Sequence, residues 1–139
     1  MSRRALQVLT GILALVPILT GLVGMMGLDD PLYVAAALPR DATLDSNLRF
    51  YAGIWCGLGL GALWLIPRIE AETKVFRLLW LMIFIGGLDR LVSLSLVGLP
   101  FLPFVGFTVL EVIGASLFVW WQSQIARLPL EEADKFKSK

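Results

Sequence analysis

The sequence contains no histidine and only one cysteine among its 139 residues. The absence of histidine removes the commonest general base and the usual protein ligand of haem iron and of zinc. The single cysteine, Cys56, cannot form a disulfide within the chain, and it lies in an apolar run where packing is its expected role. We therefore expect neither a metal site nor a bound cofactor.

Charged residues are also scarce, at 17% of the chain, and they leave a net charge of only +1. No continuous stripe of lysine and arginine is available to follow a phosphate backbone, so a nucleic-acid partner is not expected. Apolar residues make up 58% of the sequence, and the mean hydropathy is +0.79. Because these residues fall in four long runs, the composition is typical of an integral membrane protein.

The four runs predict an all-α, up-down bundle of four membrane-spanning helices. At 1.5 Å per residue, each run is long enough to cross about 30 Å of hydrocarbon. A short interfacial helix from Pro31 to about Leu38 is expected between the first two, because Asp30 suits an N-cap and proline suits the first helical position. Residues 1–126 would form the membrane domain and residues 127–139 a charged cytoplasmic tail, with helices over about 5–28, 46–66, 75–97 and 104–125.

The distribution of basic residues predicts the orientation. Nine of the 12 lysines and arginines lie in the leader, around the turn after the second helix or in the tail. The positive-inside rule then places both the N-terminus and the C-terminus in the cytoplasm. Four tryptophans lie at the same ends of the helices, where an aromatic belt is expected: Trp64, Trp80, Trp120 and Trp121.

Asp89 and Arg90 interrupt the apolar run of residues 75–97. At the centre of a bilayer each such residue costs roughly 2.5 to 3.5 kcal/mol on insertion scales. Charged residues in this setting usually face the interior of a bundle, pair with other polar groups and mark a functional site. This stretch is therefore the first candidate for function.

Two other helices bring ionisable groups to a similar depth. Glu111 lies seven residues into the fourth helix, and Arg49, with Asn47 beside it, lies near the outer end of the second. Our preferred pairs are Arg49 with Asp89 and Arg90 with Glu111, although swapped pairs are open. The cluster has two interpretations: a network that locks the helices in register, or an outward-opening pocket for an anionic or lipid-like ligand. The protonation of the two carboxyl groups is open as well.

Glycines line part of the second helix at intervals of four residues. Residues at this spacing share one face of a helix, and overlapping G-x-x-x-G motifs favour close helix packing in membranes. Gly86 and Gly87 precede the charged pair and would let a helix or ligand approach. For Gly53, Gly57 and Gly61 we prefer helix packing as the interpretation, and a narrow slot below Arg49 is the alternative.

Three stretches carry a resemblance to a known family: Asn47-Leu-Arg-Phe-Tyr-Ala-Gly53, Gly86-Gly87-Leu-Asp-Arg90 and Glu111. With them the chain resembles a family of small bacterial four-helix membrane proteins known as a domain of unknown function. It is more distantly similar to DoxX-type membrane proteins. The resemblance covers about Leu6 to Gln124 and implies a bacterial inner-membrane location. The family carries no established activity, so the resemblance transfers no catalytic role.

Together these features favour a small non-enzymatic inner-membrane protein. It would bind a lipid-like or anionic ligand in a polar pocket in the outer half of the membrane, or act as an accessory subunit of a larger membrane complex. The expected partners are membrane lipids, such a ligand, and another membrane protein or a second copy. A small-molecule transporter is the alternative. A lipid- or quinone-acting enzyme is less favoured, because it would depend on the carboxylates and arginines alone.

Overall fold

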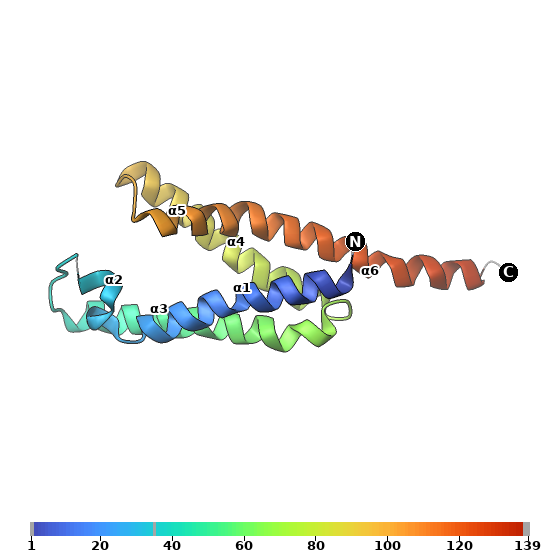
Figure 1. Ribbon diagram of the computed structural model, residues 1–139, viewed down its shortest axis with the longest axis horizontal. Helices are drawn as coiled ribbons and strands as arrows, with labels where there is room; N and C mark the ends of the chain where they lie inside the picture. The colour runs from blue at the N-terminus through green and yellow to red at the C-terminus, as the bar shows by residue number, and fades with distance from the viewer. Residues whose placement is uncertain (1, 35, 138–139) are drawn as a thin grey trace. The chain divides into compact units, whose positions relative to one another are not determined.

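The computed structural model describes the backbone of residues 2–34 and 36–137, and the side chains of residues 2–34 and 36–126. Every regular element in these ranges is helical (Figure 1). The long helices are α1 (Arg3–Gly24), α3 (Ala42–Leu65), α4 (Thr73–Leu96) and α6 (Ala115–Lys137). The shorter elements are α2 (Pro31–Val34), α5 (Leu102–Val109), a π-helical segment (Leu110–Gly114) and two 3₁₀ turns (Gly27–Asp29 and Ile66–Arg68).

Capping residues fix where α2 and α3 begin. Asp30 precedes α2 as expected, and its Oδ1 accepts a hydrogen bond from the Leu32 amide at 2.8 Å. The helix α2 ends at Val34, so it is shorter than predicted. The start of α3 was predicted near residue 46, but it lies at Ala42 because Asp41 is the N-cap. The side chain of Asp41 accepts from the Leu44 amide at 2.9 Å.

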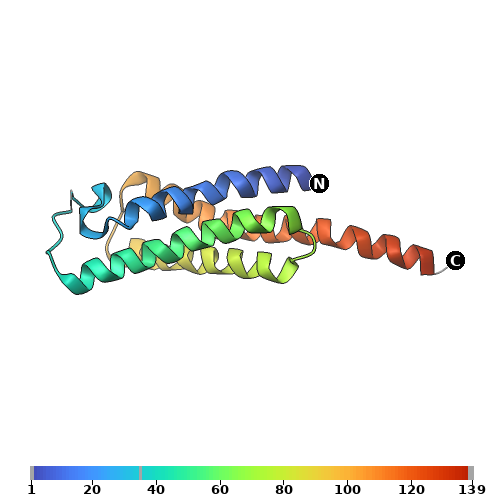
Figure 2. The ribbon, with the colours of Figure 1, turned by 90° about the horizontal axis from the view of Figure 1, so that it is seen from below.

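In the described part of the chain, three helices are long and apolar enough to cross a membrane, which suggests a membrane protein: Arg3–Gly24, Ala42–Arg68 and Leu102–Ala126. The helix α4 spans 24 residues, as long as a fourth span requires, but Asp89 and Arg90 interrupt its apolar run. Its crossing of a membrane, and with it the up-down four-helix arrangement, stays a prediction. The helix α6 continues to Lys137 through the segment predicted as a tail (Figure 2), whose side chains lie outside the described residues.

The chain divides into two compact units. The first, Val8–Ile66, contains most of α1 together with α3. A Cβ atom added at Gly21 would lie 2.8 Å from the Ala52 carbonyl oxygen, and one added at Gly59 would lie 2.8 Å from the Ala14 carbonyl oxygen. The two helices therefore pack backbone against backbone, which requires glycine at both positions.

The contact between α3 and α1 is made at a glycine that does not belong to the predicted stripe of Gly53, Gly57 and Gly61. No atom of the described residues lies within 4 Å of a Cβ added at Gly53 or Gly57, and Gly61 is half-buried. Residues two apart on a helix point about 200° apart, so Gly59 and Gly57 cannot serve the same contact. Gly59, which lies between Gly57 and Gly61 in the sequence, makes the close approach of α3 to α1. Helix packing by the stripe itself stays a prediction.

The second unit comprises the residues through Gln7 and the chain from Pro67 onward, including α4, α5 and α6. Its core contains Phe76, Trp80 and Phe118, whose rings pack with centroid separations of 5.9 and 4.5 Å. Gln122, which is 1% exposed, donates from Nε2 to the Ile69 carbonyl at 3.1 Å and to Thr73 Oγ1 at 2.9 Å. This buried amide fastens α6 to the start of α4.

Candidate functional site

Glu111 lies in the π-helical segment and is only 6% exposed. A Cβ atom added at Gly87 on α4 would lie 2.8 Å from Glu111 Cβ and 2.9 Å from Val112 Cγ2. Only glycine therefore lets α4 approach the carboxylate-bearing backbone this closely. Single π-helical turns inside α-helices occur frequently at functional sites, so the close packing and the irregular turn mark the same place.

Arg90 forms an ion pair with Glu111, with Nε 2.8 Å from Oε2. This is the pair preferred for these two residues from the sequence. The Phe104 ring covers the guanidinium group, with its centroid 5.3 Å from Cζ, a cation–π geometry. The Arg90 Nη atoms make no hydrogen bond with any residue in the described ranges. One edge of the guanidinium is thus anchored, and the other edge is available.

Asp89 differs from its neighbour in both exposure and partners. Its side chain is exposed and makes no hydrogen bond or ion pair with any residue whose side chain the structure describes. Because Gly87 packs on Glu111, a residue two positions later points about 200° away from that contact. Gly86 and Ser93 lie at helical spacing from Asp89 and are exposed. We call Gly86, Asp89 and Ser93 the open face of α4.

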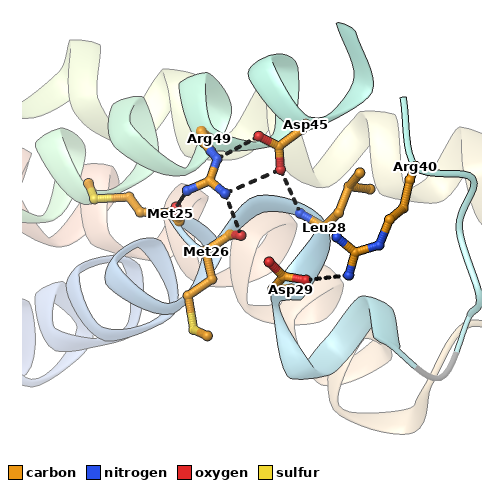
Figure 3. A network of polar contacts seen from close by, with 7 residues as sticks. All are labelled: Met25, Met26, Leu28, Asp29, Arg40, Asp45 and Arg49. Carbon is orange, nitrogen blue, oxygen red and sulfur yellow. Dashed lines mark hydrogen bonds and ion pairs between the residues drawn. The ribbon is translucent and has the colours of Figure 1, made fainter. Parts of the chain in front are cut away.

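Arg49 is engaged within the first unit, as Figure 3 shows. Its Nε donates to Asp45 Oδ2 at 2.7 Å, and its Nη atoms donate to the carbonyl oxygens of Met25 and Met26. Asp45 Oδ1 in turn accepts from the Leu28 amide at 3.0 Å. Arginine and carboxylate together fasten the chain after α1 to the first turns of α3.

The five residues of the predicted polar cluster therefore fall in both units. Asp89, Arg90 and Glu111 belong to the second unit, and Asn47 and Arg49 belong to the first. The partner expected for Arg49 was Asp89, whereas the carboxylate that it binds is that of Asp45. Asn47 is exposed, and its side chain makes no hydrogen bond in the described part of the chain.

Sequence reasoning missed two polar residues that have defined structural roles. Asp45 lies four residues before Arg49, and this helical spacing, which favours an ion pair, was the available signal. Gln122 has no such partner within its own helix, so only its isolation in an apolar run could have singled it out. The π-helical segment has no sequence signature that we recognise.

The chemistry open to these groups is recognition through charge and hydrogen bonds. Around the π-helical segment, the second unit offers the exposed carboxylate of Asp89, the free Nη edge of Arg90 and the half-buried Arg90–Glu111 ion pair. Within the described residues, no three histidine, cysteine, aspartate or glutamate side chains gather closely enough to hold a metal ion.

Comparison with known proteins places the chain in a family without assigning it an activity. No curated protein matches the sequence. No solved structure matches it either. A family model matches residues 5–122, most of the chain. The chain therefore belongs to the family described as "Domain of unknown function (DUF4345)".

Proposed function

We propose that this chain is a non-enzymatic protein of the bacterial inner membrane that acts as an accessory subunit, docking a partner helix on the open face of α4. The observation that carries the proposal is the exposed carboxylate of Asp89, which has no partner among the described residues. In this proposal α4 also crosses the membrane, and both termini lie in the cytoplasm, as the basic residues predict.

The energetic argument concerns the cost of a lone carboxylate in lipid. At the centre of a spanning helix an aspartate costs roughly 2.5 to 3.5 kcal/mol on insertion scales, and charged residues inside the membrane normally pair. A partner helix that brings an arginine, a lysine or another hydrogen-bond donor to Asp89 would offset that cost. None of the described atoms lies within 4 Å of a Cβ added at Gly86, so the surface one turn from Asp89 leaves room for a helix backbone.

A second candidate, binding of an anionic or lipid-like ligand, has its own supporting observation. The free Nη edge of Arg90 can bind a carboxylate or phosphate by paired hydrogen bonds. A site that uses both arginines has less support, because each of the three guanidinium nitrogens of Arg49 already donates to Asp45 or to a backbone carbonyl. The alternatives of a transporter or an enzyme have no comparable observation in their favour.

Photo-crosslinking from the open face tests the docking proposal. A photo-reactive amino acid would replace Ser93 in the full chain, expressed in its own membrane, and cross-linked species would be identified by mass spectrometry. We expect one discrete protein adduct, which Asp89→Asn weakens and Glu72→Gln leaves unchanged. Glu72→Gln is the matched control because it removes the same charge from the residue that precedes α4.

The identity of the adduct separates the alternatives. A different membrane protein supports an accessory subunit, and an adduct of twice the chain mass identifies a second copy as the partner. Cross-links to lipid alone, or a protein adduct that Asp89→Asn does not affect, would contradict docking through this carboxylate.

A further inference from the structure

The second unit has an apolar groove between α4 and α6, away from the ion pair. Its volume is about 460 Å³, and it is lined by Arg77, Trp80 and Phe84 on one side and by Ala115, Ser116 and Val119 on the other. Ala115 and Ser116 are small and face large aromatic side chains, so the two helices do not fill the space between them. The groove is open on one side, which gives access from the surface of the unit.

Among the described residues that line this groove, Arg77 is the only charged one. Arg77 is exposed and makes no hydrogen bond or ion pair with any residue that the structure describes. It lies one turn into α4, which begins at Thr73, so it belongs to the end of the helix rather than to its middle. From Arg77 to Phe84 the groove runs along α4 for about 11 Å at 1.5 Å per residue.

We propose that this groove binds an anionic phospholipid, with an acyl chain against Trp80 and Phe84 and the phosphate on the Arg77 guanidinium. An apolar groove open to the side suits a chain that is already in the hydrocarbon phase. A guanidinium at the end of that groove suits a phosphate at headgroup level, because it offers two parallel hydrogen bonds to phosphate oxygens. Basic pockets between spanning helices near the cytoplasmic surface bind anionic headgroups in this way.

The charge around this end of α4 supports an anion rather than a zwitterion. Arg77 and Lys74 are both exposed on the first turns of the helix, and neither has an ion-pair partner within the described residues. Arg3, by contrast, is held by Glu70 at 3.3 Å. The first turns of α4 therefore carry two positive charges that no described carboxylate pairs with, while Glu72, directly before the helix, carries one unpaired negative charge. The proposal concerns lipid recognition and does not depend on docking of a protein partner at the open face.

Native mass spectrometry of the full chain in detergent micelles tests the proposal. The protein would be titrated with phosphatidylglycerol and with phosphatidylcholine of identical acyl chains. We expect the wild type to prefer phosphatidylglycerol, and Arg77→Gln to weaken that binding about tenfold or more, the usual scale for a charge-assisted hydrogen bond. Ser116→Leu, which places a larger side chain in the groove, is expected to weaken binding of both lipids.

The matched control is Lys74→Gln, which removes one positive charge from the same helix end at a residue that does not line the groove. Preference retained in Lys74→Gln but lost in Arg77→Gln supports a built site. Equal losses in the two variants would reduce the effect to diffuse attraction and overturn the proposal. Absence of any preference in the wild type, or binding of free oleate with no binding of phosphatidylglycerol, would overturn it as well.

Discussion

Replacing Gly87 by alanine tests whether α4 packs directly on the π-helical segment. The added methyl group would lie 2.8 Å from Glu111 Cβ and 2.9 Å from Val112 Cγ2, whereas ordinary contacts begin near 3.4 Å. Both neighbours sit on a helix that packs along α4, so relief requires the helices to separate. Overpacking of this kind typically costs about 1 to 3 kcal/mol.

Gly86→Ala is the control that isolates the free-energy cost of this overpacking. Within the part of the chain that the structure describes, no atom lies within 4 Å of a Cβ at Gly86, so the same substitution one residue earlier meets open space. Both variants gain the same helix propensity of alanine over glycine, roughly 1 kcal/mol. The difference between them therefore reports the packing clash alone, and we expect Gly87→Ala to be less stable than Gly86→Ala by about 1 to 3 kcal/mol.

The assay is reversible unfolding in mixed micelles, followed by tryptophan fluorescence, with both variants in the same detergent. For a chain of this size a difference of 1 kcal/mol corresponds to roughly 2 to 4 °C in Tm. Equal stability of the two variants would refute the close approach of α4 to Glu111. A loss in Gly86→Ala instead of Gly87→Ala would mean that the helix presents the opposite face to its neighbour.

Two further predictions concern the ion pairs. Glu111→Gln should destabilise the chain by about 1 to 3 kcal/mol, because Glu111 is buried but the Arg90 that it leaves unpaired keeps 36% exposure; unfolding in the same micelles measures this, and an unchanged midpoint would count against the pair. Asp45→Asn should speed hydrogen exchange at the Leu28 amide, because the carboxylate accepts from that N–H. Arg40→Gln should leave hydrogen exchange at the Leu28 amide unchanged, because the ion pair between Arg40 and Asp29 is highly exposed. Equal exchange in both variants would contradict a specific role for Asp45.

Helical structure followed from the sequence because each element carries its own signals. Long apolar runs specify helices, and Asp30 before Pro31 specifies the start of a short one. The boundary of α3 was misplaced because Asp41, Asp45 and Ser46 are all acceptable caps by residue type. Which of them accepts a backbone hydrogen bond depends on the path of the preceding loop.

The pairing of the charged residues was only partly predictable, because residue type and depth in the membrane do not fix the direction in which a side chain points. Matching depth on adjacent helices favoured Glu111 as the partner of Arg90 but left the swapped pairs open, and the structure pairs Arg90 with Glu111. The partner of Arg49 does not follow from matching depth, because Asp45 lies one turn before it on α3 and the loop after α1 brings two carbonyl groups within reach. Local hydrogen bonds require less chain ordering than a long-range pair.

The sequence by itself determined that the chain is helical, strongly apolar and without histidine, because composition and periodicity are properties of the chain alone. Only the tertiary structure decided which glycines make contact, where the π-helical turn lies, and that Asp89 points away from the ion pair beside it. The physical reason is that a helix repeats every 3.6 residues. A neighbouring helix selects one of its faces, and that selection decides whether adjacent residues are buried together or turned apart.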